Sequence, residues 1–514
     1  MRAATQTGGI QGAATRRSDT TARMRMAAPV TPQTIGLWGC SKAHNKIDHK
    51  QAPRDIDEIS HEPMRKLLAF SGIDRATFYT LVGRGFNLLS GLITLLLVAK
   101  FLTEQEQGYY YTFTGLLAMQ LLFELGMSYV VMQFASHEMA HLQWGEDGLI
   151  TGDRNALSRL RSITLLVIKW YSLVAALIVL VVLPTGWIIF SRSHPVGDVN
   201  WEWPWAWLVL STAINVFLMP LLAMLEGCGK VTEIAVLRTT QNVVGSAFAW
   251  IVLMLHGGVA ALPAMNAAMA LTSLIWLWHT KFPLFKSLME SAVAGAQVSW
   301  RKEIWPLQWK VAVSWFSAYF IFQLFTPLTF IYRGAVEAGQ MGMSIAIANA
   351  LTSIALAWMN TKAPQFGALV AKKDFTTMDR LFRFALSRSL TVMVLLGIGL
   401  CTLNFILHAE SNQFAVRLLD PAIFTLLIAA TCCVYVTNAQ SIYLRANKEE
   451  PFMYLNVASA ALTSASTFFL GKLFGASGMI AGYLAISVFV GLAGGSAIFY
   501  AKRRTYRDGY PGPR

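Results

Sequence analysis

Apolar blocks long enough to cross a lipid bilayer recur along this chain, and they constrain its fold more than any other feature. A bilayer core is about 30 Å thick, and a helix of roughly 20 residues spans it. Backbone groups in lipid must be bonded within the segment, and runs this long do not fit barrel strands, so each block predicts a helix. The sequence thus predicts an all-α integral membrane fold with twelve transmembrane helices, at approximately 77–101, 108–134, 163–190, 203–225, 234–256, 259–278, 306–331, 339–361, 385–408, 421–444, 452–470 and 478–500.

Composition agrees with this class and excludes others. Of the 514 residues 55% are hydrophobic and only 14% are charged, whereas a soluble protein has about 25% charged residues. The net charge of +14 is concentrated at the chain ends and in alternate loops, which indicates membrane orientation and no nucleic-acid partner. The five cysteines show no CxxC spacing, and they suggest neither a disulfide framework nor a zinc knuckle. No cofactor or resident metal is predicted.

The distribution of Lys and Arg predicts which side each loop faces. Basic residues gather in the N-terminal extension, in the C-terminal tail and in the loops after even-numbered helices, whereas the loops after odd-numbered helices are short and nearly free of them. By the positive-inside rule both termini are cytoplasmic. Short outer loops leave no folded external domain that would hold an active site.

The longest internal loop divides the chain into two sets of six helices. We expect a disordered basic cytoplasmic extension (1–70), an N-terminal six-helix lobe (75–280), a cytoplasmic inter-lobe linker (281–305), a C-terminal six-helix lobe (306–501) and a basic tail (502–514). The halves echo each other, because Glu106-Gln107-Gly108 opens the second helix and Glu337-Ala338-Gly339 opens the eighth. Two parallel repeats of six helices around a central cavity form a transporter architecture.

Four stretches in order carry a resemblance to a known family. The first is FLTEQEQGYYYTFTGLLAMQLLFELGMSYVV (101–131), in which Glu124 precedes Leu-Gly-Met; the others lie at 225–231, 337–364 and 443–448. Over about residues 75 to 500 the chain resembles the polysaccharide and O-antigen (lipid-linked oligosaccharide) flippases of the multidrug/oligosaccharidyl-lipid/polysaccharide exporter superfamily. It departs from the pattern in its long N-terminal extension, and in Gln105 where the family often has a nearby proline.

The resemblance implies a function. Such a flippase carries a polyprenyl-pyrophosphate-linked oligosaccharide across a bacterial inner membrane by alternating access, for cell-surface polysaccharide biosynthesis and without covalent chemistry. Its partners would be the lipid-linked glycan, membrane lipids and the polysaccharide assembly machinery. The alternative within the same superfamily is an ion-coupled exporter of small molecules such as drugs.

Ionisable residues inside predicted spans are costly and are therefore functional hypotheses. Arg84 lies in the first helix between Gly83 and Gly85, where a guanidinium has room to bind a pyrophosphate through paired, charge-assisted hydrogen bonds. The competing interpretation is that its side chain reaches back to the cytoplasmic headgroups. Lys310 is the corresponding candidate near the cytoplasmic end of the seventh helix.

The remaining candidates are less sharply placed. Lys169 and Arg238 lie within reach of an interface, and Glu124 in the second helix is either paired structurally or used as a coupling proton site. Bases outnumber acids within the helices, which favours an anionic substrate over a cation. Further polar positions could line a sugar pathway or join helices, namely Gln120, Asn215, Gln241, Asn242, Gln323 and Asn349.

One motif points to a different class of protein. His137-Glu138-Met139-Ala140-His141 fits H-E-x-x-H, which on a helix places two imidazoles and a general base around Zn²⁺. We expect an unbroken helix from Gln133 to Trp144 that puts both histidines on one face. A working site also needs a third ligand and a water-filled cavity, and the sequence supplies no clear third ligand. An intramembrane zinc protease is therefore the distant alternative.

Overall fold

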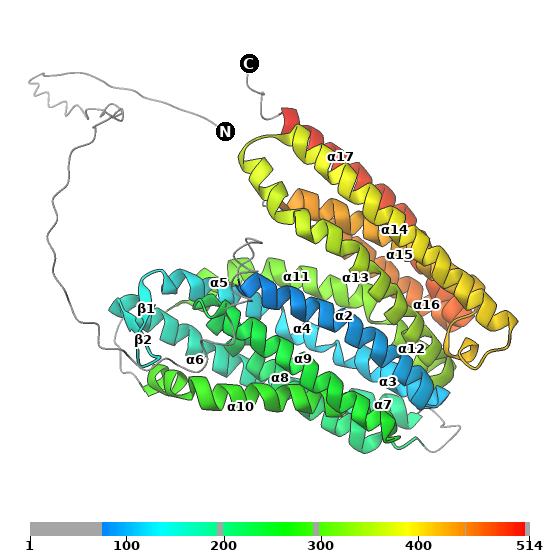
Figure 1. Ribbon diagram of the computed structural model, residues 1–514, viewed down its shortest axis with the longest axis horizontal. Helices are drawn as coiled ribbons and strands as arrows, with labels where there is room; N and C mark the ends of the chain where they lie inside the picture. Colours follow the sequence, from blue (N-terminus) through cyan, green and yellow to red (C-terminus); the bar gives the residue numbers. More distant parts are fainter. Residues whose placement is uncertain (1–74, 193–198, 291–297, 448, 509–514) are drawn as a thin grey trace, which may run out of the picture. The chain divides into compact units, whose positions relative to one another are not determined.

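The computed structural model describes residues 75–192, 199–290, 298–447 and 449–508 (Figure 1). The predicted extension 1–70 lies outside these ranges. Nearly every described residue belongs to a helix, so the predicted all-α membrane fold is confirmed. Strands contribute one small hairpin.

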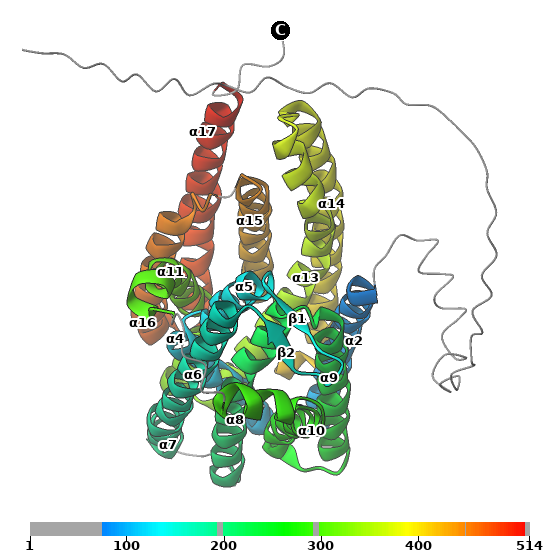
Figure 2. The same cartoon turned by 90° about the vertical axis from the view of Figure 1, so that its left-hand side faces the viewer.

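The N-terminal half consists of nine helices, which Figures 1 and 2 show in blue to green. In chain order they are α2 (Arg75–Phe101), α3 (Glu104–Leu117), α4 (Gln120–Glu124), α5 (Met127–Met139), α6 (Arg154–Leu177), α7 (Leu183–Arg192), α8 (Glu202–Gly227), α9 (Val231–Met254) and α10 (Ala261–Glu290). A π-helical turn, Ile178–Val182, joins α6 to α7, and a 3₁₀ turn, Gly258–Ala260, precedes α10.

The C-terminal half begins with a π-helical turn, Trp300–Ile304, and contains the helices shown in yellow-green to red. These are α11 (Trp305–Phe322), α12 (Phe325–Arg333), α13 (Ala335–Ala371), α14 (Phe375–Ala409), α15 (Pro421–Arg445), α16 (Met453–Ile486) and α17 (Gly495–Asp508). A 3₁₀ turn, Ala415–Arg417, precedes α15, and a π-helical stretch, Ser487–Gly494, links α16 to α17.

These helices account for the twelve predicted spans. Within the described ranges, nine helices are long and apolar enough to cross a membrane, and a tenth span is formed if the bent pair Glu104–Glu124 and Met127–Met139 counts as one. The helix at the fifth predicted span, α9, does not meet the same test, since Arg238, Gln241 and Asn242 interrupt its apolar run. The last two predicted spans lie in the single stretch Met453–Arg507, which Gly475 divides with non-helical backbone (φ 65°).

The second span differs from its prediction. The sequence suggested one continuous helix over 108–134, but the chain forms α3, α4 and α5, and the α4–α5 junction bends by 44°. Both Leu125 and Gly126 adopt left-handed backbone there. The expectation of an unbroken helix to Trp144 is also wrong, because α5 ends at Met139 and β1 (Leu142–Trp144) pairs antiparallel with β2 (Ile150–Gly152).

The ends of the helices fall into two groups. One end of the bundle, which we call the basic end, is where α2, α6, α9, α11, α14 and α16 begin. The other, which we call the opposite end, is where α3, α8, α10, α13 and α15 begin. The basic end carries the β1–β2 hairpin and the C-terminus of α17 (Figure 2). Each half has its own apolar core, with Phe113 and Trp205 in the N-terminal half and Phe366 and Tyr443 in the C-terminal half.

The two echoing motifs meet where α3 crosses α13 at the opposite end. A Cβ on Gly108 would stand 2.8 Å from the Cα of Ala335 and closer still to its carbonyl group, and a Cβ on Gly339 would stand 3.0 Å from the backbone nitrogen of Gly108. Glycines with no side chain let two backbones approach this closely. The echo in the sequence therefore marks the contact between the two halves.

The acidic residues of the two motifs also occupy matching places. Glu106 completes a capping box with Thr103 at the start of α3 and lies against Gly258 in the turn before α10. Glu337 lies against Gly475 and accepts a 2.7 Å hydrogen bond from the backbone nitrogen of Ala476. In each half the acid of the second span thus abuts a left-handed glycine between the fifth and sixth spans, which supports an internal repeat.

Candidate functional site

A cavity of about 1110 Å³ lies between the two halves. Its wall is formed by α2 and α3 with parts of α9 and α10 from one half, and by the α11–α12 junction and α13 from the other. A stripe along α2 supplies Arg84, Asn87, Gly91, Thr94 and Val98. Residues three and four positions apart share a face of a helix, so this spacing turns the whole stripe toward the cavity.

Arg84 is the sole charged side chain on the described wall, which contains no carboxylate. It is exposed and forms no ion pair with any residue whose side chain the structure describes. The other polar groups are amides and hydroxyls, including Asn242, Gln323, Asn349 and Asn360. The cavity therefore combines one unneutralised positive charge with neutral hydrogen-bonding groups.

The two glycines beside Arg84 have different surroundings. A Cβ on Gly83 would stand 2.7 Å from Oγ1 of Thr239, so this glycine allows α2 to approach α9. A Cβ on Gly85 would meet nothing within 4 Å. Open space next to the guanidinium is thus provided by Gly85, whereas Gly83 serves helix packing.

The crossing of α3 and α13 closes the cavity toward the opposite end. Gln107 is buried there and its side-chain amide donates to the carbonyl oxygens of Gly339 (2.9 Å) and Arg417 (3.0 Å). The guanidinium of Arg417 in turn donates to the carbonyl oxygen of Leu102 (2.6 Å). At the basic end, by contrast, the lining residues Arg84 and Asn360 are exposed. The cavity is thus accessible from the basic end and sealed at the other.

Three of the other predicted site residues, Lys169, Arg238 and Glu124, do not belong to the described wall of this cavity. Lys169 is exposed on α6, and Arg238 on α9 forms a 2.8 Å ion pair with Glu226. Glu124 is buried outside the cavity at the end of α4. Lys310 belongs to α11, but its side chain lies outside the described part of the structure.

Five of the six neutral polar positions divide between the two roles considered for them. Three line the cavity, namely Asn242, Gln323 and Asn349. Two join helices instead, because Asn215 donates to the carbonyl oxygen of Asn266 (2.9 Å) and Gln241 donates to Ser273. The sixth, Gln120, begins α4 and is not part of the described cavity wall.

Asn87 and Thr94 also line the cavity and were not predicted. Their spacing of three and ten residues from Arg84 would have placed them on the same face of α2.

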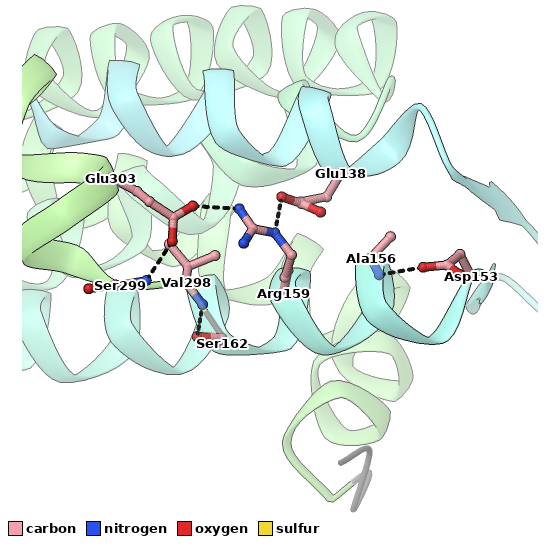
Figure 3. A network of polar contacts seen from close by, with 8 residues as sticks. All are labelled: Glu138, Asp153, Ala156, Arg159, Ser162, Val298, Ser299 and Glu303. Atoms are coloured by element: carbon pink, nitrogen blue, oxygen red, sulfur yellow. Dashed lines mark hydrogen bonds and ion pairs between the residues drawn. The ribbon is translucent and has the colours of Figure 1, made fainter. Parts of the chain in front are cut away.

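The H-E-x-x-H motif forms part of an ion-pair cluster. Figure 3 shows Arg159 of α6 between Glu138 of α5 and Glu303 of the turn before α11, with N–O distances of 2.7 Å to each. His141 lies beyond the end of α5 (Met139), so the helical face expected for the two histidines does not exist. The described residues contain no group of three or more His, Cys, Asp or Glu that could hold a metal.

This cluster has a second layer of contacts at the same place. The backbone nitrogen of Ser299 donates to Glu303 (2.9 Å), and that of Val298 donates to Ser162 of α6 (3.2 Å) (Figure 3). The Arg159 guanidinium, followed by the Ser299 amide, holds the pKa of Glu303 below its usual range. The segment that leads into α11 is thus tied to the N-terminal half at the basic end.

Comparison with known proteins places this geometry in a fold. No protein-family profile matches the chain, and no curated protein matches its sequence. Among solved structures, the MATE multidrug transporter DinF-BH, solved in a ligand complex, has a TM-score of 0.55 at 13% identity, covering 89% of this chain and 99% of that one. The lipid II flippase MurJ in its inward closed conformation has a TM-score of 0.51 at 14% identity, covering 83% and 87%.

A third match is the Vibrio cholerae MATE transporter VcmN, solved as a point mutant, with a TM-score of 0.50 at 13% identity over 87% of this chain and 99% of that one. Identities this low establish a shared fold alone. The chain therefore has the fold of this lipid II flippase and of these multidrug transporters.

Proposed function

We propose that this chain is a flippase that moves a polyprenyl-pyrophosphate-linked oligosaccharide across the membrane by alternating access. In this proposal it resides in a bacterial inner membrane with both termini in the cytoplasm, and it works beside polysaccharide assembly machinery. The observation that carries the proposal is the charge of the cavity: one cation, Arg84, and no carboxylate on the described wall.

The sign of that charge separates the two substrate classes. An exporter of organic cations needs a carboxylate or another acceptor of positive charge in its cavity, because a buried charge must be paired. A guanidinium instead offers a fork of N–H donors that matches two phosphate oxygens and carries a permanent positive charge. Arg84 lies at the exposed mouth of the cavity, beside the open space at Gly85. Those features suit a diphosphate headgroup presented from the basic end.

The rest of the wall suits a glycan. Asn87 and Thr94 continue along α2 beyond Arg84, and Asn242, Gln323 and Asn349 face them from other helices. Amides and hydroxyls both donate and accept hydrogen bonds, which matches the mixed donors and acceptors of sugar hydroxyls. The volume of about 1110 Å³ lies at the upper end of ordinary ligand pockets, which run to roughly 1,000 Å³.

Direct binding tests this proposal. The full chain is reconstituted in nanodiscs, and a fluorescent polyprenyl diphosphate is titrated in the presence and absence of inorganic pyrophosphate. Arg84→Ala should weaken binding at least tenfold, because it removes a charge-assisted bidentate contact worth about 1.5–3 kcal/mol. Arg84→Lys should restore only part of the affinity, since an ammonium cannot form the fork.

The matched control is Lys169→Ala, which removes an exposed basic residue that is not on the cavity wall. The affinity of the Lys169→Ala variant for the polyprenyl diphosphate should equal that of the unaltered chain. Equal losses in both variants would mean that binding reflects general surface charge, and unchanged binding in Arg84→Ala would refute the assignment. Tighter binding of a cationic rhodamine dye than of the diphosphate would favour a multidrug exporter instead.

A further inference from the structure

Glu124 occupies an unusual position in the second span. It is the last residue of α4, and the two residues that follow it, Leu125 and Gly126, both have left-handed backbone before α5 begins at Met127. Left-handed backbone is uncommon for a leucine. The helix is therefore broken next to an acidic side chain, within a segment that otherwise crosses the membrane.

The carboxyl group of Glu124 is buried and incompletely bonded. Only 2% of the residue is exposed, and Oε1 has no hydrogen-bond partner among the described residues. No basic side chain in the described part of the chain forms an ion pair with it. Burying an ionised carboxylate without a partner is very costly. The described surroundings therefore do not neutralise an ionised Glu124 in the position seen here.

The groups around Glu124 are hydroxyls. Ser128, one turn along α5, and Tyr171 of α6 interact with it, and they bond to each other at 3.1 Å. On α11, which packs along α4, the titratable residues are Tyr319, which is buried, and Lys310, whose side chain is not described. Tyr129 of α5 is exposed and accepts from Gln133.

We propose that Glu124 is a proton-binding site whose occupancy controls the break between α4 and α5. Protonated, the carboxyl group is tolerated in its buried position. After losing its proton to water, it is expected to leave that position, which requires α4 and α5 to rearrange about Leu125 and Gly126. A proton suits this site better than a transition-metal ion, because the described residues offer no group of three or more His, Cys, Asp or Glu; Na⁺ is distinguished from a proton by the experiment below.

The break is connected to the tie between the halves at the basic end. Tyr171, which contacts Ser128, adjoins Trp170, and the indole of Trp170 stacks on Trp300 with ring centroids 6.0 Å apart. Trp300 begins the turn that also holds Glu303, the partner of Arg159. A shift of α6 caused by Glu124 would therefore reach the segment that leads into α11. The inference rests on the proposed transport function in one respect: the proton would supply the energy for transport.

Distance measurements between spin labels test the proposal without any substrate. Gln143→Cys in the hairpin and Thr376→Cys at the start of α14 are both exposed and lie at the basic end. They are labelled in a full-length chain whose five native cysteines are replaced. Distances are recorded in nanodiscs across a range of roughly four pH units that begins about one unit above the ordinary carboxyl pKa of about 4.3. If one proton separates two conformations, their population ratio changes by up to tenfold per pH unit. Glu124→Gln, which mimics the protonated form, should abolish this pH response.

Two further variants keep the outcome decisive. Glu124→Asp should retain the response with a shifted midpoint, so it separates loss of titration from loss of folding. Glu226→Gln alters an acid that is paired with Arg238 away from the break, and it should respond like the parent. A pH response that persists in Glu124→Gln would overturn the proposal, as would a parent that responds to Na⁺ at constant pH but not to pH.

The same experiment separates this inference from the proposed function. Arg84→Ala should leave the pH response intact while it weakens diphosphate binding. Loss of diphosphate binding with a normal response in Arg84→Ala supports both proposals. Normal diphosphate binding in Arg84→Ala together with a Glu124-dependent response would refute the substrate assignment and leave the proton site standing. Glu303 does not complicate the result, because its pKa is held below the usual carboxyl range and it stays ionised near neutrality.

Discussion

Gly108 seals the cavity at the opposite end, and replacing it with alanine should open that seal. Its missing side chain is what lets α3 approach α13: an added Cβ would stand 2.8 Å from the Cα of Ala335 and 2.5 Å from its carbonyl carbon. Real Cβ atoms essentially never come within 3.0 Å of another heavy atom. Because the obstacle is backbone and cannot rotate away, the two helices must separate.

The magnitude follows from overpacking, which costs about 1–3 kcal/mol at a tight contact. The better helix propensity of alanine, about 0.8–1.0 kcal/mol, acts on α3 in the sealed and the open state alike and so cancels between them. The overlap at Gly108 involves three backbone atoms of Ala335, so we place the cost at the upper end of that range. The penalty on the sealed state is then about 2–3 kcal/mol, which corresponds to a factor of roughly 30–150 in population.

Cysteine labelling measures this change. Ser353→Cys places a thiol on the cavity wall, and a membrane-impermeant maleimide is added from the side of the opposite end in oriented proteoliposomes. Gly108→Ala should accelerate labelling by about 30- to 150-fold, in proportion to the population that opens. The matched control is Gly399→Ala on α14, where an added Cβ meets nothing within 4 Å. Unchanged labelling in Gly108→Ala, or the same acceleration in the control, would refute the view that this glycine contact is the seal.

Three other variants have defined outcomes. Arg503→Met removes the bidentate partner of Asp379, a carboxylate that is 5% exposed and accepts from Arg503 at 2.9 and 2.5 Å. Breaking such a pair costs about 3–5 kcal/mol when it is fully buried. Because the Arg503 side chain is 24% exposed, we expect a loss of unfolding free energy near the lower end of that range in a thermal unfolding assay. Glu303→Gln should loosen the start of α11 in hydrogen exchange at neutral pH. The folded-state pKa of Glu303 is lowered, so its stabilisation is fully present above the unfolded value of about 4.3 and is lost as the pH falls through the lower folded value, below which the variant and the parent should exchange alike. Trp144→Phe removes a 2.8 Å hydrogen bond to a backbone carbonyl and should raise exchange in the β1–β2 hairpin by about fivefold, since such a bond contributes about 1 kcal/mol; unchanged exchange would mean that packing alone holds the hairpin.

The class of fold was predictable from the sequence because a bilayer permits few solutions. Long apolar runs can only be helices there, and the twelve predicted segments match the described helices to within a few residues at most ends. The echo of Glu106-Gln107-Gly108 and Glu337-Ala338-Gly339 also pointed to two related halves, since small residues are what closely packed membrane helices require. Local composition carries both signals.

The break in the second span was not predictable in the same way. Gly126 is a helix-weakening residue, but glycines are common in transmembrane helices and most of them do not break the chain. Gly399 illustrates this, because it lies inside the continuous helix α14. What differs at Leu125 and Gly126 is tertiary: the contacts of α4 with α6 and α11 hold it at an angle to α5. Such contacts join residues far apart in the sequence.

The H-E-x-x-H motif failed for a related reason. The pattern has its chemical meaning only if one helix continues through both histidines, and α5 ends between them. The glutamate of the motif, Glu138, forms an ion pair with Arg159, and the β1–β2 hairpin separates these two residues in the sequence. A spacing rule reports on chemistry only when the backbone keeps the period that the rule assumes.

The two ends of the bundle are held by interactions of different physical kinds, and this difference suggests which end yields first. At the opposite end the contact is mainly glycine packing and hydrogen bonds of buried Gln107 to backbone oxygens, neither of which depends on salt. A charged group also takes part in this seal, since the guanidinium of Arg417 donates to the neutral oxygens of Gln107 and Leu102. At the basic end the tie is an ion-pair cluster in which the side chains of Arg159 and Glu303 are 26% and 33% exposed. The screening length shortens to about 3 Å at roughly 1 M salt, so high ionic strength should loosen the start of α11 in hydrogen exchange and leave the crossing of α3 and α13 protected. Equal loosening at both ends would show that the seal depends on the charge of Arg417 more than on the packing of Gly108 and Gly339.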